Sequence, residues 1–295
     1  MPDTQLVDVH AHICDPAFDP DRAEVLTRAQ WAGVAAIVAV GENLGDARKN
    51  VALARTYPMI KAAAGLYPTI LDLDQADEMV AFIRLNCSHL VAIGEVGLDY
   101  WVVKEDSQKE VQREILKRFV ELSKVLELPL NIHSRSAGRH AIALLLENSA
   151  TRVQMHAFDG KAGAALPAVE AGYFFSIPPS VIRSRQKQKL VKRLPLASLL
   201  VETDSPVLGP APQTRNEPAN LSVSIQTIAQ IKGVPEAAVM EAVSENTRRL
   251  YGVWYATGTT GYEKHPDTGG RLNGDSLLFD LEPNLSCEGI RTVHA

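Results

Sequence analysis

The sequence predicts a single α/β domain of the (β/α)8, or TIM-type, barrel class. The first observation is a regular alternation of short apolar segments with longer amphipathic ones over residues 4–250. The second is length, because 295 residues are many for one ordinary domain but suit a barrel of this kind. The third is a composition of 46% hydrophobic and 22% charged residues, which supplies a large core.

The predicted strands are apolar along their whole length, as parallel strands are when helices cover the sheet. They span residues 6–12, 35–40, 60–67, 90–98, 129–135, 152–158, 173–178 and 199–204. An open, doubly wound sheet is the alternative, but no Gly-rich phosphate-binding fingerprint follows the first strand. The barrel is therefore the preferred architecture.

Helices are expected between the strands. Residues 19–33 begin with Asp and Pro and end at Gly, and residues 110–128 carry apolar side chains at three- and four-residue spacing. Further helices are expected at 137–150, 163–172, 220–233 and 235–252. We assign residues 1–254 to the barrel domain. Residues 255–295 are rich in Gly and Thr without a sustained period, so we expect a loosely packed or disordered extension and assign it no function.

The formal net charge of −5 excludes a protein that coats nucleic acid through bulk electrostatics, but not an enzyme that binds a few phosphates. The N-terminus lacks the pattern of a secretory signal, and no apolar run approaches 18 residues. We therefore expect no membrane association and an intracellular location, cytoplasmic with the nucleus as an alternative. No feature indicates an obligate protein partner.

Polar side chains stand where five of the predicted strands end, which is where barrels of this class carry their chemistry. Any one histidine could be an ordinary hydrogen-bonded core residue. Four imidazoles converging on one mouth would instead leave several ring nitrogens unpaired unless a metal bound them. The candidate ligands are His10, His12, Glu95, His133, His156 and Asp204.

This nitrogen and oxygen donor set suits Zn²⁺, Mn²⁺ or a similar ion, and the absence of cysteine favours a catalytic site over a structural one. Six ligands exceed the needs of one tetrahedral ion. A pair of divalent ions ~3.5–4 Å apart and bridged by Glu95 would account for the number, and a single ion is the alternative.

The motifs "DVHAH", "IGEVGLD", "NIHSR", "MHAFDG" and "VETDSP", in this order, resemble the TatD family of metal-dependent deoxyribonucleases, which are amidohydrolase-type barrels. The likeness runs from Leu6 to Leu250. It implies that the six residues above bind metal, that Glu95 is shared between ions, and that Asp204 also handles protons. It also implies 3′→5′ exonuclease action on DNA with Mg²⁺, Mn²⁺ or Zn²⁺.

The resulting hypothesis is phosphodiester hydrolysis by a metal-activated water, with Asp204 and Glu95 as catalytic residues. DNA is the expected substrate, as single strands or 3′ ends and without sequence specificity. The main rival is a barrel hydrolase acting on an amide, a lactone or another phosphoester. Many such enzymes have a carboxylated lysine where this chain has Glu95. A non-catalytic metal-binding scaffold is a weaker rival, because no candidate ligand is missing.

Four residues are expected to contact substrate. Tyr67 replaces the histidine of the family's Gly-x-His-Pro motif and could donate a hydrogen bond, stack on a base, or only pack at the mouth. Arg135 could bind a phosphate or pair with Asp99 or Glu95. Arg215 and Asn216, in "RNEP", could bind phosphate or lie in a solvated loop. The basic residues of 182–193 could follow a DNA strand or form a solvated helix face.

Overall fold

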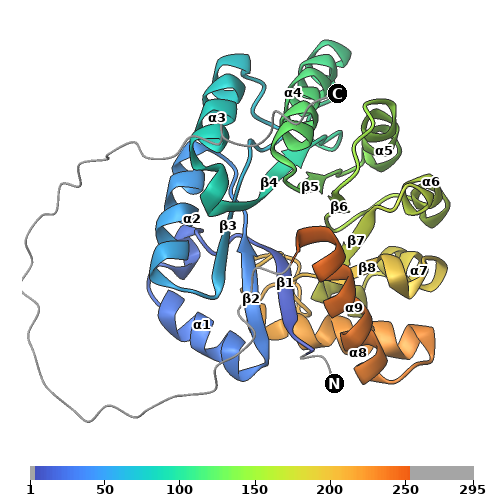
Figure 1. Ribbon diagram of the computed structural model, residues 1–295. Coiled ribbons are helices and arrows are strands. Elements are labelled where there is room, and N and C mark those ends of the chain that lie inside the picture. The colour runs from blue at the N-terminus through green and yellow to red at the C-terminus, as the bar shows by residue number, and fades with distance from the viewer. Residues whose placement is uncertain (1–3, 253–295) are drawn as a thin grey trace, which may run out of the picture.

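The computed structural model describes residues 4–252, which form the predicted barrel (Figure 1). Eight parallel strands pair in sequence order from first to last, and helices surround them. The strands are β1 (Leu6–Ala11), β2 (Val34–Ala39), β3 (Ile60–Ala64), β4 (Leu90–Gly97), β5 (Leu130–His133), β6 (Val153–Met155), β7 (Phe174–Ile177) and β8 (Leu199–Val201). Each coincides with a predicted strand, so the fold class is confirmed.

The barrel closes between the C-terminal part of β1, with His12 after it, and the segment that follows β8. The amide of Asp204 donates to the carbonyl of His10 at 2.8 Å, and the amide of His12 donates to the carbonyl of Ser205 at 2.8 Å. The Asp8 carboxylate strengthens this seam by accepting hydrogen bonds from the amide and hydroxyl of Thr203. Closure therefore places His10, His12 and Asp204 side by side.

The helices are α1 (Arg22–Trp31), α2 (Leu44–Thr56), α3 (Leu73–Asn86), α4 (Asp106–Leu126), α5 (Gly138–Glu147), α6 (Leu166–Glu170), α7 (Arg185–Arg193), α8 (Leu221–Lys232) and α9 (Glu236–Tyr251). The side chains of Asn43 and Asp72 cap α2 and α3 by accepting backbone amides of the first turn. None of the helices between residues 4 and 252 is both long and apolar enough to cross a membrane.

Two differences from the predicted elements have simple causes. The segment predicted as a helix over 163–172 is a 3-10 turn (Ala162–Ala165) followed by the short α6, because Pro167 lacks an amide proton and can occupy only the first turn of a helix. Several strands end earlier than predicted, so His12, His156 and Asp204 follow their strands and belong to the βα loops. The predicted extension over 255–295 lies outside the described residues.

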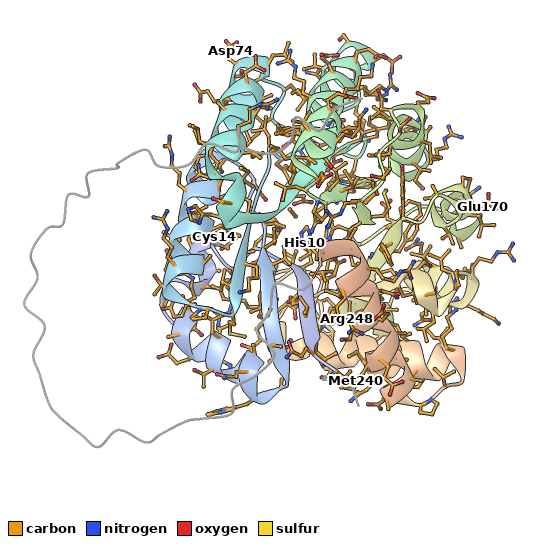
Figure 2. The ribbon with its side chains drawn as sticks, viewed as in Figure 1. His10, Cys14, Asp74, Glu170, Met240 and Arg248 are labelled. Atoms are coloured by element: carbon orange, nitrogen blue, oxygen red, sulfur yellow. The ribbon has the colours of Figure 1, made fainter. Side chains whose placement is uncertain are left out.

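The main hydrophobic core lies between the strands and the surrounding helices. A smaller cluster of buried side chains joins residues of β1, β2, β3, β4, β7 and β8 to Leu250 and Tyr251 at the end of α9. In Figure 2, His10 lies centrally among the strands, whereas Asp74 and Glu170 lie out on the surrounding helices. His10 therefore lies within the barrel, inside the ring of helices.

Candidate metal centre and active site

The six predicted metal ligands converge on one point at the C-terminal end of the strands. The Nε2 atom of His10 lies 3.4 Å from Nε2 of His12 and 3.4 Å from Oδ1 of Asp204. The Nε2 atom of His12 lies 3.4 Å from Oε2 of Glu95. Potential metal-ligand atoms on β1, on β4 and in the loops after β1 and β8 therefore each lie within hydrogen-bonding range of at least one other.

Glu95 also faces the imidazole of His133 on β5 and that of His156 in the loop after β6. Its Oε1 atom lies 2.6 Å from Nδ1 of His133 and 3.7 Å from Nε2 of His156. Two groups of potential ligand atoms contain Glu95, one of His10, His12 and Glu95 and the other of Glu95, His133 and His156. A third group consists of His10, His156 and Glu202.

Three of the imidazoles are oriented by a buried oxygen on the far side of the ring. Nδ1 of His10 lies 2.8 Å from Oδ1 of Asn131, and Nδ1 of His156 lies 3.0 Å from Oε2 of Glu202. Nε2 of His133 lies 3.2 Å from Oδ2 of Asp99. Each ring is thereby fixed with its other nitrogen toward the cluster centre, as in protein metal sites where a hydrogen bond sets the ligand's tautomer.

The residues fit a divalent cation on their own chemistry. Oε2 of Glu95 is buried and has no hydrogen-bond partner, although a buried carboxylate oxygen normally has one. It faces only imidazole nitrogens at distances of 3.4 and 4.0 Å. A cation ligated by imidazole and carboxylate would satisfy that oxygen and the inward-facing nitrogens together.

Two glycines allow Glu95 to approach its partners. Gly94 and Gly97 lie against β5, and a Cβ on Gly94 would come within 2.5 Å of the Cβ of Asn131. Gly97 has a φ of 156°, and a Cβ there would lie 2.0 Å from the carbonyl oxygen of His133. The "GEVG" motif therefore gives β4 the close contact with β5 that brings Glu95 to His133.

Three residues in or near the cluster have an unusual backbone conformation. Ala157, Asp204 and Leu208 have φ values of 40°, 55° and 50°, a region that residues other than glycine seldom adopt. Ala157 is held by its amide, which donates to Glu202 at 2.8 Å, and Leu208 by its carbonyl, which accepts the amide of Ser180 at 2.8 Å. The surrounding hydrogen bonds maintain these conformations, as is common at functional sites.

In the cluster, buried carboxylates and imidazole rings face one another and shift each other's pKa. Burial opposes charge on Glu95 and Asp204, yet the surrounding imidazoles lower the pKa of both carboxyls below the ordinary range. Burial also opposes charge on His12 and His133, yet the carboxylates raise the pKa of both rings, that of His133 to about 9. The same carboxylate field would favour a divalent cation, whose binding displaces protons from the rings.

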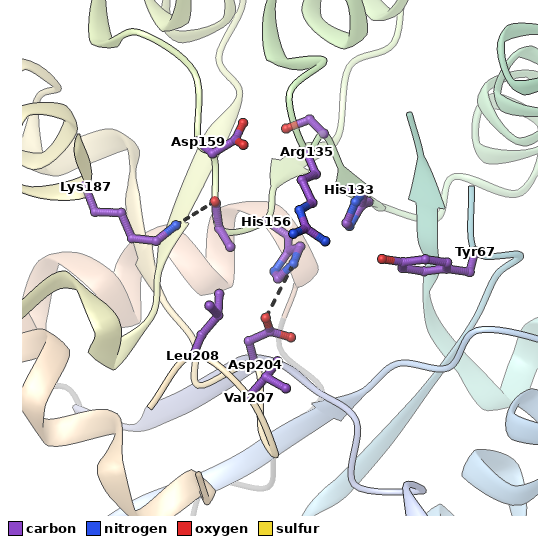
Figure 3. Close-up of a pocket in the computed structure, with 11 residues that line it drawn as sticks. Tyr67, His133, Arg135, His156, Asp159, Lys187, Asp204, Val207 and Leu208 are labelled. Atoms are coloured by element: carbon purple, nitrogen blue, oxygen red, sulfur yellow. Dashed lines mark hydrogen bonds and ion pairs between the residues drawn. The ribbon is translucent and has the colours of Figure 1, made fainter. Parts of the chain in front are cut away.

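A pocket of about 400 Å³ opens directly over His133, His156 and Asp204 (Figure 3). Tyr67 and Lys187 stand on opposite sides of it, and Arg135 projects over its centre. The Tyr67 ring meets the His133 ring edge-on, with centroids 5.0 Å apart. Burial, and then the carboxylates of Glu95 and Asp99, raise the pKa of the Tyr67 hydroxyl, so it remains a neutral hydrogen-bond donor.

Arg135 lines the pocket and is exposed, with its guanidinium carbon 5.2 Å from the centroid of the Trp101 ring. Across residues 4–252 it forms no ion pair with Asp99 or Glu95, because both carboxylates face His133. The guanidinium is therefore available to an anion in the pocket. Its predicted contact with substrate stays a prediction.

Arg215 and Asn216 do not line this pocket. The guanidinium of Arg215 forms a bidentate ion pair with the carboxylate of Asp21, the residue before α1, with N···O distances of 2.8 and 2.5 Å. The buried amide of Asn216 donates to the carbonyls of Thr203 and Val207 at 2.7 and 2.8 Å. Both residues shape the loop after β8 here, and a contact with substrate would require these interactions to rearrange.

The basic residues of 182–193 divide into two groups. Arg183, Arg185, Lys189, Lys192 and Arg193 are exposed. Lys187 is buried, lines the pocket, and donates from Nζ to the carbonyl of Ala157 at 2.7 Å. Burial, partly offset by the carboxylates of Glu202 and Asp204, lowers its pKa. Within this segment, Lys187 is therefore the cation that reaches the site.

Sequence reasoning did not identify Asn131 or Glu202 as site residues, and it named Lys187 only as one of the basic residues of 182–193. Asn131 and Glu202 each stand two positions before a candidate ligand, His133 and Asp204, so the two-residue alternation of a strand could have indicated them. Lys187 carries no such signal. Its position depends on how α7 packs against the loop after β6.

Comparison with known proteins agrees with this geometry. The TatD related DNase family matches residues 7–252. "Deoxyribonuclease TATDN3" from Homo sapiens is 47% identical over 83% of this chain and 94% of its own length, and "3'-5' ssDNA/RNA exonuclease TatD" from Escherichia fergusonii is 32% identical over 84% and 99%. Other relatives carry the name metal-dependent hydrolase.

A solved structure supports the fold as well. The crystal structure of a TatD homologue from Escherichia coli superposes with a TM-score of 0.78 at 28% identity, covering 84% of this chain and 98% of the other. The family match covers residues 7–252, which is nearly the whole barrel. This chain therefore belongs to the TatD family of deoxyribonucleases and metal-dependent hydrolases, enzymes that act on ester bonds.

Proposed function

We propose that the protein is a metal-dependent 3′→5′ exodeoxyribonuclease that acts on single strands or on frayed 3′ ends. The observation that carries the proposal is the Glu95 carboxylate, which is common to two groups of ligand atoms and has one buried oxygen without a hydrogen-bond partner. Such a donor set suits two divalent ions, Zn²⁺, Mg²⁺ or Mn²⁺, sharing one carboxylate.

Divalent ions bound at this site would supply a water of lowered pKa and positive charge next to the scissile phosphate. The protein's own side chains would accept a proton and bind the phosphate. Asp204 is 5% exposed and lines the pocket beside the imidazoles, where it can accept the proton of the attacking water. Arg135 and Lys187 flank the same space and can hold phosphate oxygens. Tyr67 can donate its neutral hydroxyl.

The substrate class follows from the pocket and from the relatives. A pocket of about 400 Å³ accommodates about one nucleotide rather than a duplex. Deoxyribonuclease action comes from the name of the human relative, and 3′→5′ action on single strands from the name of the Escherichia fergusonii relative. No ordered array of base-reading side chains surrounds the pocket within residues 4–252, which favours cleavage without sequence specificity.

The proposal is tested by measuring metal content and nucleotide release together. The full chain is stripped with a chelator, reconstituted with Zn²⁺, Mg²⁺ or Mn²⁺, and given a single-stranded oligonucleotide labelled at its 5′ end. We expect a ladder that shortens one nucleotide at a time from the 3′ end, and no products from the stripped protein. Internal cuts without a ladder would contradict exonuclease action. Bound metal with no cleavage of DNA would redirect the search to other phosphoesters and amides.

Tyr67→His gives a second prediction. Histidine is the residue that the family motif carries at this position, and an imidazole beside Glu95 and Asp99 can take a positive charge near the phosphate. We expect kcat/KM on oligonucleotides to rise severalfold. Tyr67→Phe serves as the control, because it removes the hydroxyl and keeps the ring that packs on His133. A clear loss in Tyr67→His would indicate that this chain uses the tyrosine as its own substrate contact.

A further inference from the structure

Trp101 is a large aromatic side chain exposed beside the pocket. It lies in the loop between β4 and α4 and is 59% exposed, although burying an indole would be strongly favourable. Its neighbour Val102 is 54% exposed. An exposed tryptophan at the rim of a ligand pocket often marks a contact surface.

The loop that carries Trp101 is fixed to the site. Oδ1 of Asp99 accepts the amides of Trp101 at 2.8 Å and of Val102 at 2.9 Å, while Oδ2 of the same carboxylate faces His133. The amide of Tyr100 donates to the carbonyl of Arg135 at 2.9 Å. The loops after β4 and β5 are thus joined, and Trp101 is held at a defined position relative to the metal centre.

Two cationic side chains lie close to the indole. The guanidinium carbon of Arg135 lies 5.2 Å and Nζ of Lys104 lies 5.4 Å from the centroid of the Trp101 ring. Arg135 also lines the pocket, so one side chain contacts the aromatic ring and reaches the proposed phosphate position. An exposed aromatic ring near cations, next to a proposed phosphate site, is an arrangement that binds single-stranded nucleic acid.

We propose that Trp101 and Arg135 form a stacking platform for one base of a single DNA strand whose scissile phosphate lies in the pocket. The proposal rests on the proposed function and specifies how the strand is held. Stacking does not distinguish bases, which fits cleavage without sequence specificity. An intact duplex would keep its bases paired and could not offer one to the indole. The platform therefore favours single strands and frayed ends.

The test uses the full chain carrying Asp204→Asn, so that substrate is bound and not consumed. Binding of a fluorescein-labelled oligothymidylate is measured by anisotropy in the parent and after a further change of Trp101→Ala, Trp101→Phe or Trp31→Ala. We expect Trp101→Ala to weaken binding about tenfold, as loss of one stacked base does. We expect Trp101→Phe to retain most of the affinity. Trp31→Ala, which removes an indole that is 82% exposed on α1, should not change it.

Oligothymidylates with one abasic site at successive positions make the test specific. At one position, loss of the base should weaken the parent by the same factor as Trp101→Ala and should not weaken Trp101→Ala further. Equal affinity of Trp101→Ala and the parent, or abasic effects that do not depend on Trp101, would overturn this inference alone. Failure of the metal-loaded protein to bind or cleave any oligonucleotide would overturn both this inference and the proposed function.

Discussion

Asp204→Asn is expected to abolish hydrolysis while leaving the barrel folded. Asparagine has nearly the same shape, and the backbone amide at this position can still donate to the carbonyl of His10. The substitution removes the negative charge that faces the imidazoles of His10 and His12 and removes a proton acceptor at the pocket. We expect kcat to fall by about 10³-fold or more, the range for loss of a general base that also contributes charge.

The measurement is single-turnover cleavage of a labelled oligonucleotide at saturating enzyme, with metal content and circular dichroism recorded on the same sample. Asp159→Asn is the matched control. Asp159 lines the same pocket, but its carboxylate accepts the amide of Ser136 at 3.0 Å and does not face the imidazole cluster. We expect a far smaller loss from that change. Full activity in Asp204→Asn would remove the proton-handling role and the metal-ligand role together.

The sequence was sufficient for the architecture because the barrel repeats one local pattern. Each strand is marked by its own apolar, β-branched residues, and the ends of parallel strands must meet on one face of the closed sheet. That reasoning brought His10, Glu95 and His156 together without any knowledge of long-range contacts. Strand ends were less accurate, since hydrogen bonding to the neighbouring strand decides where a strand stops.

The residues that surround the metal ligands were harder to predict. Arg215 pairs with Asp21, and the two residues are 194 positions apart in the chain. Nothing local in "RNEP" indicates that partner, which stands directly before the first residue of α1. Asn131 and Glu202 act through the far nitrogens of His10 and His156. Such roles depend on ring orientation, which only the assembled barrel determines.

Glu95→Gln should reduce metal content as well as activity. The amide keeps the size of the side chain and can still bond to Nδ1 of His133, so a stable fold is expected. It loses the charge that both groups of ligand atoms share. We expect turnover to fall by about 10³-fold or more, with a similar or larger loss for Glu95→Ala. Metal per chain is measured by mass spectrometry after dialysis against a weak chelator.

Glu202→Gln is the matched control, and we expect it to lose less metal and less activity than Glu95→Gln. Glu202 bonds to the far nitrogen of His156 and to the amide of Ala157, and it is not among the proposed ligands. Loss of such an orienting partner typically costs about 10–100-fold in metal affinity or activity, so Glu202→Gln should fall between the wild type and Glu95→Gln. If Glu95 bridges two ions, Glu95→Gln should lose both of them together. Loss of one ion while the other stays bound would show instead that Glu95 belongs to a single-ion site. An unchanged rate in metal-loaded Glu95→Gln would contradict a shared carboxylate.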